Sequence, residues 1–117
     1  EHNKGMAFCL HSSVVEILKE HCDRIIYIST VPIWNDENYK KNVYFESKRA
    51  GEHKALNDNN GVVIRTNIYG NGGLVKWATN ELSAGKKING FSDVYFNPVH
   101  TAQLSERVIK LCQNVTF

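Results

Sequence analysis

Residues 24–30 read Arg24-Ile25-Ile26-Tyr27-Ile28-Ser29-Thr30. The run is short, rich in β-branched and aromatic residues, and ends in two hydroxyl side chains. A continuous apolar run of this length is typical of a buried strand in a parallel sheet. Open α/β sheets place their ligand crevices at the carboxyl ends of the strands. Ser29 and Thr30 are therefore predicted to lie at such a crevice.

Other segments alternate with this strand along the chain. Helical periodicity predicts helices at residues 7–21, 43–57, 74–84 and 101–113, and a second apolar run predicts a strand at 62–66. Asn42 is suited to cap the second helix, and Gly85 to end the third. On the third helix, the residues expected to face the core are Leu74, Val75, Ala78 and Leu82. This alternation predicts the α/β class, a mostly parallel sheet with helices on both faces.

Tyr44 and Lys48 stand four residues apart near the start of the second predicted helix. Side chains at this spacing share one helix face, about one turn apart. A lysine cation at that distance lowers the pKa of a phenol, so the pair can move a proton onto or off a carbonyl oxygen. The spacing alone is a weak signal, because it arises often by chance.

The order of the motifs resembles the short-chain dehydrogenase/reductase superfamily, and within it the extended branch that acts on nucleotide sugars. The similar segments are Ile28-Ser29-Thr30, Val43–Glu52, Val63–Gly70 and Asn97-Pro98-Val99-His100, in family order. Within the branch, the Ser29-Thr30 ending and the Pro98-Val99 turn are most similar to the dTDP-4-dehydrorhamnose reductases.

The resemblance implies a catalytic set of Thr30, Tyr44 and Lys48. Tyr44 would donate the proton, and Thr30 would hydrogen-bond the same substrate oxygen. Ser29, Tyr44 and Lys48 would contact the cofactor, NAD or NADP, and Lys48 would bind its ribose hydroxyls. Thr30 and Asn67 would contact a nucleotide-sugar substrate. Arg65 is left out of this set, because an arginine at a strand end more often pairs with a carboxylate.

The glycine-rich turn that holds a dinucleotide pyrophosphate is missing from the sequence. Residues 1–117 are therefore expected to be the middle and C-terminal part of a doubly wound, Rossmann-like parallel sheet, a partial NAD(P)-binding domain that would be inactive alone. Elements at about residues 70–100 are expected to form part of a small substrate-binding lobe.

Gly70-Asn71-Gly72-Gly73 follows the second predicted strand and opens a helix. Val75 stands at the third glycine position of the G-x-G-x-x-G pattern, so the segment is not a dinucleotide fingerprint. Backbone amides at this helix start would suit an anion, such as the diphosphate of a nucleotide sugar. A flexible glycine turn before a helix explains the segment equally well.

Three functions remain open at this point. The first is an NAD(P)-dependent reductase that delivers hydride to a 4-keto deoxysugar nucleotide. The second is an NAD-dependent sugar-nucleotide epimerase or dehydratase that uses the same Tyr44 and Lys48. The third is a non-catalytic regulatory subunit of the same fold, whose sign would be a broken catalytic set, whereas Thr30, Tyr44 and Lys48 are all present.

The composition limits which binding partners and which cellular compartment are expected. The formal net charge of +2 comes from scattered residues, which does not support nucleic acid binding. Three cysteines form no Cys-x-x-Cys pair and five histidines show no ligand spacing, so neither a disulfide framework nor a metal site is expected. No apolar run is long enough to span a bilayer, so a cytoplasmic protein without membrane contact is expected. A homodimer is implied by the resemblance.

Overall fold

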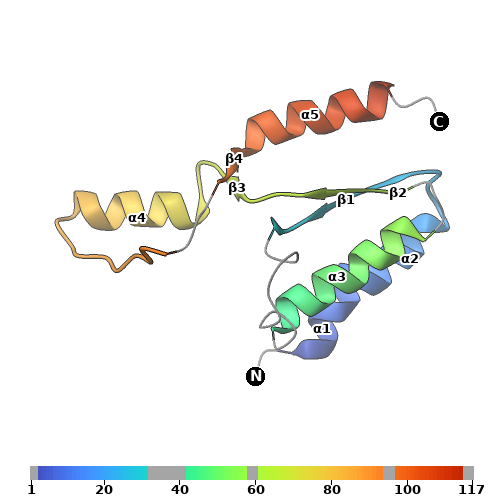
Figure 1. Cartoon of the computed structure of the whole chain (residues 1–117), viewed down its shortest axis with the longest axis horizontal. Coiled ribbons are helices and arrows are strands. Elements are labelled where there is room, and N and C mark those ends of the chain that lie inside the picture. The colour runs from blue at the N-terminus through green and yellow to red at the C-terminus, as the bar shows by residue number, and fades with distance from the viewer. Residues whose placement is uncertain (1–2, 32–41, 58–60, 94–96, 115–117) are drawn as a thin grey trace. The chain divides into compact units, whose positions relative to one another are not determined.

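A computed structural model of the chain describes residues 3–31, 42–57, 61–93 and 97–114. The chain divides into two compact units, Glu1–Thr66 and Asn67–Phe117. Each unit contains a two-stranded parallel sheet together with helices (Figure 1). The predicted α/β class is confirmed. Among the described residues the strands form two small sheets rather than one larger sheet.

The first unit is built around a strand–helix–strand element. β1 (Ile25–Ser29) pairs in parallel with β2 (Gly61–Arg65), with Ser29 opposite Arg65. α3 (Val43–Leu56) lies between them in the sequence and packs on both strands. Its start is fixed as expected, because the Asn42 side chain accepts a hydrogen bond from the backbone N–H of Tyr44 at 2.9 Å.

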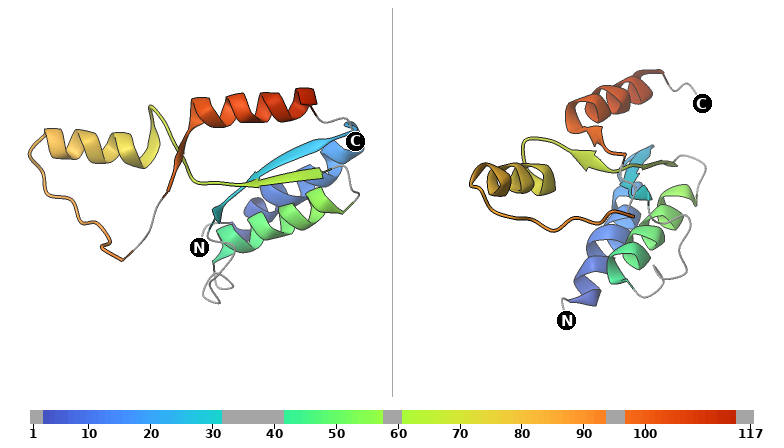
Figure 2. Two further views of the ribbon diagram at one scale, coloured as in Figure 1. Left: turned by 45° about the horizontal axis from the view of Figure 1, so that its top comes forward. Right: turned by 60° about the vertical axis from the view of Figure 1, so that its left-hand side comes forward.

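A bent helical segment precedes β1. It consists of α1 (Lys4–Phe8), the π-helical turn η1 (Cys9–Ser13) and α2 (Val14–Lys19). The segment begins earlier than predicted because Asn3 caps it, its side chain accepting from the Met6 N–H. Figures 1 and 2 show this segment beside α3 on the same side of the β1–β2 pair.

The core of the first unit is small and partly polar. Its buried apolar side chains are Val15, Tyr27 and Ala55, with Ile25 and Val63 packed against them. The buried polar side chains are Ser12, Ser29, Ser47 and Glu52. Buried polar groups are costly unless they are paired. The hydrogen-bond partners of these four buried polar side chains are therefore important for the stability of the first unit.

Gly51 allows α3 to approach η1 and β1. A Cβ atom at this position would lie 1.9 Å from the His11 carbonyl oxygen and 2.3 Å from the Tyr27 hydroxyl oxygen. Neither neighbour can move away easily, since the first is backbone and the second is buried. The smallest possible side chain is therefore too large at residue 51.

We expect Gly51→Ala to lower the free energy of unfolding by about 1–3 kcal/mol or more, because overpacking forces the helices apart. Urea denaturation measures the change. Gly5→Ala is the matched control, since its nearest neighbour would be at an ordinary 3.4 Å and alanine is the better helix former. An unchanged denaturation midpoint for Gly51→Ala would contradict the close approach.

The second unit contains short strands and two helices. β3 (Ile68–Tyr69) pairs in parallel with β4 (Val99–His100), α4 (Gly73–Ser83) follows β3, and α5 (Thr101–Asn114) follows β4. Past the end of α4, Gly85 adopts a φ of 71°, a left-handed conformation that favours glycine, as predicted.

The predicted inward face of α4 is wrong. Leu74, Val75 and Leu82 are 68%, 42% and 57% exposed, and Ala78 is only half-buried. The physical reason is the size of the sheet. β3 and β4 are two residues long, so they offer no surface wide enough to cover an 11-residue helix. The periodicity of the sequence predicts the helix correctly. It does not show whether a sheet surface is present to cover the apolar side of that helix.

Candidate functional site

The ammonium group of Lys48 is held at the carboxyl end of β1. Lys48 Nζ donates a hydrogen bond to the Ile28 carbonyl oxygen at 2.9 Å and lies 5.1 Å from the centre of the Tyr27 ring. Burial lowers the pKa of Lys48, and the Glu52 carboxylate partly opposes this effect. An ammonium has three N–H donors. Two therefore remain after the bond to Ile28, at the strand end where the sequence predicted a ligand crevice.

Tyr44 lies in the first turn of α3 with 46% of its surface exposed. Its ring meets the His11 ring edge to face, with centroids 5.6 Å apart. The Tyr44 ring contacts the His11 ring, the Lys48 ammonium lies over the Tyr27 ring, and the Tyr27 hydroxyl donates to the His11 carbonyl oxygen. Within the described ranges, however, no hydrogen bond joins the phenol to Lys48, Ser29 or Thr30.

The two strand-end hydroxyls differ in their surroundings. Ser29 is 3% exposed on the face of β1 that α3 covers, and its Oγ has no hydrogen-bond partner in the described part of the chain. The nearby hydroxyl helps to lower the pKa of Glu52, although the two groups are not in hydrogen-bond geometry. Thr30 follows directly after the strand and is half-buried. A buried hydroxyl without a hydrogen-bond partner is uncommon. Of the two hydroxyls, Ser29 is therefore the one whose hydrogen-bonding capacity is unused in the described part of the chain.

Glu52 and Arg65 form a bidentate ion pair at the carboxyl end of β2. Arg65 donates from Nε to Glu52 Oε1 at 2.8 Å and from Nη2 to Oε2 at 2.6 Å. The Glu52 side chain is 4% exposed and that of Arg65 33%. Burial alone raises the pKa of Glu52, but the Arg65 hydrogen bonds and cation, with Ser29, bring it below its usual range. The prediction that Arg65 pairs with a carboxylate is confirmed.

His11 and Ser47 connect the π-helical turn η1 to the Tyr44 end of α3. His11 Nδ1 lies 2.8 Å from Ser47 Oγ, and Ser47 Oγ donates to the Tyr44 carbonyl oxygen at 2.9 Å. The Tyr27 hydroxyl donates to the His11 carbonyl oxygen at 3.0 Å, and burial raises the pKa of Tyr27 to about 12. Burial, followed by the Lys48 charge, lowers the pKa of His11. The His11 ring and backbone are therefore both fixed.

Asn67 belongs to the second unit, whereas Ser29, Thr30, Tyr44 and Lys48 belong to the first. Its carbonyl oxygen accepts a hydrogen bond from the Val99 N–H at 2.8 Å, beside the β3–β4 pair. The structure thus brings Ser29, Tyr44 and Lys48 to one end of β1 and α3. The role of Asn67 toward a substrate stays a prediction.

A pocket opens at the glycine turn of the second unit. Its volume is about 410 Å³, and it is lined by β3, by Gly70–Gly73, by the first residues of α4 and by Thr101. Gly73 has a φ of 68°, and no side chain caps this helix start. Open amides at a helix start agree with the anion site that the sequence suggested, and equally with a plain turn.

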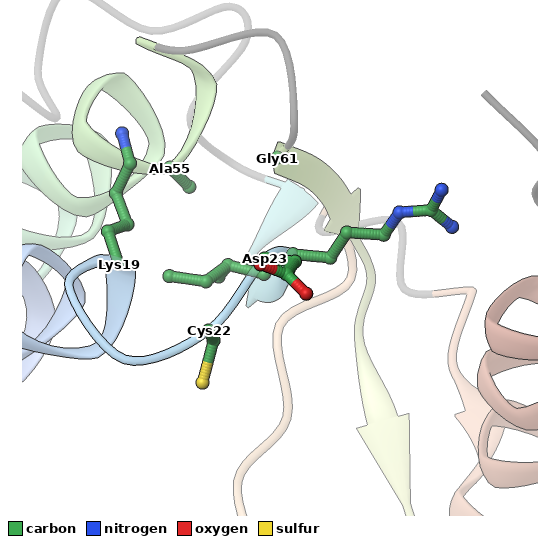
Figure 3. Close-up of a pocket in the computed structure, with 7 residues that line it drawn as sticks. Lys19, Cys22, Asp23, Ala55 and Gly61 are labelled. Carbon is green, nitrogen blue, oxygen red and sulfur yellow. The ribbon is translucent and has the colours of Figure 1, made fainter.

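Another cavity, of about 80 Å³, lies in the first unit, at the amino ends of β1 and β2. Figure 3 shows Lys19 and Ala55 on the helices, Cys22 and Asp23 on the loop before β1, and Gly61 at the start of β2. The Lys19 ammonium is already engaged with the Lys54 carbonyl oxygen at 2.8 Å. Ligands of open α/β sheets bind at the carboxyl ends of the strands. This cavity at the amino ends is therefore not our candidate site.

Two classes of feature are not found in the described residues. These residues contain no group of three or more histidine, cysteine, aspartate or glutamate side chains that could hold a metal ion. They also contain no helix with the length and apolar composition needed to cross a membrane. No family model, curated protein or solved structure matches the chain.

Sequence reasoning missed His11, Ser47 and Tyr27, which surround the predicted pair. All three act through contacts between residues 16 to 36 positions apart in the chain, which local spacing does not reveal. One signal was available, since Ser47 lies between Tyr44 and Lys48 in a helix whose same-face neighbours are Gly51 and Ala55. A serine on such a face is expected to be buried and to need a partner.

Proposed function

We propose that the chain carries the proton-transfer site of an NAD(P)-dependent oxidoreductase that reduces a 4-keto deoxysugar linked to a nucleotide. One observation carries the proposal. The Lys48 ammonium is anchored at the carboxyl end of a parallel strand, one helical turn from the exposed phenol of Tyr44. Beside them the buried hydroxyl of Ser29 has no partner in the described part of the chain. A phenol, a cation and a hydroxyl side by side can give a proton to a carbonyl oxygen and stabilise the charge that builds there.

The proposed fold is part of a doubly wound, Rossmann-like sheet. The parallel pairing of β1 with β2 and the position of α3 across both strands support it. In such a sheet, β1 would deliver its hydroxyls to the cofactor crevice. Within the second unit taken by itself, the pocket at Gly70–Gly73 is a candidate for binding the diphosphate of a nucleotide sugar.

The residues present fit a nicotinamide nucleotide at one point. Lys48 keeps two N–H donors for ribose hydroxyls, whereas the Ser29 hydroxyl, buried beneath α3, would need a local movement to reach the cofactor. When bound, the reduced nucleotide supplies the hydride that adds to the carbonyl carbon of the sugar. The anchoring of Lys48 to Ile28 places its donors in advance, so little conformational entropy is lost on binding.

The protein groups manage the charge that builds on the carbonyl oxygen. Tyr44 gives its proton to that oxygen as the hydride arrives, which converts the ketone to an alcohol. The Thr30 hydroxyl hydrogen-bonds the same oxygen, and the Lys48 cation stabilises the tyrosinate that remains until solvent returns the proton. Hydride and proton together account for the reduction, and the other product is NAD or NADP.

The test is an oxidation assay on the full-length protein. NADH or NADPH is mixed with a panel of nucleotide-linked keto sugars, and the absorbance of the reduced cofactor is followed. We expect loss of the reduced cofactor only when protein and a 4-keto sugar nucleotide are both present. A panel that gives no oxidation with either cofactor would remove the reductase proposal.

A further inference from the structure

We propose that His11 is a positioning residue for Tyr44, which it holds through Ser47; this inference rests on the proposed function. Among the described residues, no hydrogen bond joins His11 to Ser29, Thr30 or Lys48. It reaches the Tyr44 turn of α3 in two ways, by the hydrogen bond from its ring to Ser47 and by the ring contact with Tyr44. No sequence motif pointed to this residue.

The hydrogen-bond pattern fixes the tautomer of His11. Ser47 has one hydroxyl proton, and its geometry directs that proton to the Tyr44 carbonyl oxygen at 2.9 Å. The Ser47 oxygen then has only lone pairs to offer to His11 Nδ1, which lies 2.8 Å away. Nδ1 must therefore carry the proton. The result is a directed chain of hydrogen bonds from the His11 ring through Ser47 to the backbone of Tyr44.

Burial makes this chain of hydrogen bonds rigid. Ser47 is 0% exposed, so water cannot replace either of its partners. The carbonyl oxygen of His11 is held by the Tyr27 hydroxyl and lies against Gly51. Both the backbone and the ring of His11 are thus fixed before they contact the Tyr44 turn. A rigid neighbour is what a proton donor needs when its reaction depends on position within a fraction of an ångström.

The π-helical turn explains how His11 reaches this place. The Val14 N–H reaches back to the Cys9 carbonyl oxygen, five residues earlier, so one extra residue is accommodated in the turn. An extra residue shifts the helix face on which the following side chains stand. Turns of this kind cost stability and occur frequently at functional sites. Here the turn contains both His11 and the buried Ser12.

Two substitutions at residue 11 separate positioning from simple packing. The amide nitrogen of asparagine can take the place of Nδ1 and donate to Ser47, whereas alanine can donate nothing. In the full-length protein we expect His11→Ala to lower kcat about tenfold to a hundredfold with KM nearly unchanged. We expect His11→Asn to restore most of the lost kcat. Ser47→Ala should match His11→Ala, and the double variant should lose little more, because the two residues act in one chain.

A second readout does not need the reaction. In protein with isotopically labelled tyrosine, the Tyr44 ring resonance is assigned by its loss in Tyr44→Phe. Loss of the His11 ring shifts this resonance in both variants, so the line width is compared instead. We expect His11→Ala to broaden the resonance and His11→Asn to keep it narrow. If wild type oxidises no cofactor, the proposed function fails, yet this resonance still tests the positioning role.

Three outcomes would overturn the positioning role. One is an unchanged kcat and an unchanged Tyr44 line width in His11→Ala. Another is equal impairment of His11→Ala and His11→Asn, which would show that the ring packs but does not hold Ser47. The last is a loss of activity that follows the loss of folded protein, measured by denaturation of each variant.

Discussion

Replacing Tyr44 with phenylalanine is expected to lower kcat for the reduction about a hundredfold to ten-thousandfold, the usual contribution of a general acid. The change removes one hydroxyl group and leaves the ring, so the edge-to-face contacts with His11 and Phe45 persist. Because Tyr44 is 46% exposed, the loss of the hydroxyl breaks no buried hydrogen bond and should not affect folding. The measurement is steady-state cofactor oxidation with the sugar nucleotide that wild type accepts.

Two lysine variants accompany this test. Lys48→Met removes the ammonium that sits at the strand end, and should raise KM for the cofactor as well as lower kcat. Lys54→Met is the matched control on the same helix, since its ammonium pairs with Glu16. Equal rates for wild type and Tyr44→Phe would show that the phenol is not the acid.

Replacing Arg65 with methionine is expected to lower the free energy of unfolding by about 3–5 kcal/mol, the cost of leaving a buried charge unpaired. The Glu52 side chain is 4% exposed, so water cannot solvate its carboxylate once the guanidinium is removed. Urea denaturation at neutral pH measures the loss. Lys4→Met is the control. It breaks an ion pair with Glu46 that is 65% and 33% exposed, worth about 0–1 kcal/mol.

The pH dependence identifies Glu52 as the cause. In wild type the pKa of Glu52 is lowered, so the stability it contributes is complete above its unfolded value of 4.5 and is lost as the pH falls through the lower folded pKa. In Arg65→Met burial is unopposed by Arg65, which raises the folded pKa. Protonation of Glu52 then removes an unpaired buried charge from the variant and stabilises it. In wild type, protonation of Glu52 weakens its pair with Arg65 and destabilises the protein. We expect the stability difference to begin to shrink above pH 4.5, at the raised folded pKa of the variant, and to go on shrinking until the pH has fallen past the lower folded pKa of wild type. A difference that is constant with pH would contradict this account.

Local chemistry was sufficient to predict the elements of the first unit. Asn42 caps α3 because its side chain fits the first free N–H groups, and the run before Ser29 forms a parallel strand because both of its faces are apolar. The proximity of Lys48 to the strand end also follows, once α3 packs on β1. The cap depends on residues close together in the sequence, whereas the strand pairing and the Lys48 contact join residues 20 to 36 positions apart that the strand–helix–strand order brings together.

The rest depended on contacts that spacing cannot show. The π-helical turn is a small departure from α-helix, and it is stable here because Gly51 lets α3 come close and Tyr27 caps the His11 carbonyl. The exposed face of α4 reflects the small area of the β3–β4 pair. The division of the chain after Thr66 likewise has no sequence signal, since no linker composition marks it.

The two-strand width of each sheet has a consequence for handling the protein. Among the described residues, every strand has a neighbour on one flank only. The other flank of a strand can template the addition of a foreign strand, although on β1 the Ile28 carbonyl oxygen is already taken by Lys48. We expect any self-association through these flanks to rise with concentration. Dilution and short incubation, more than added stability, will therefore keep the isolated chain monodisperse.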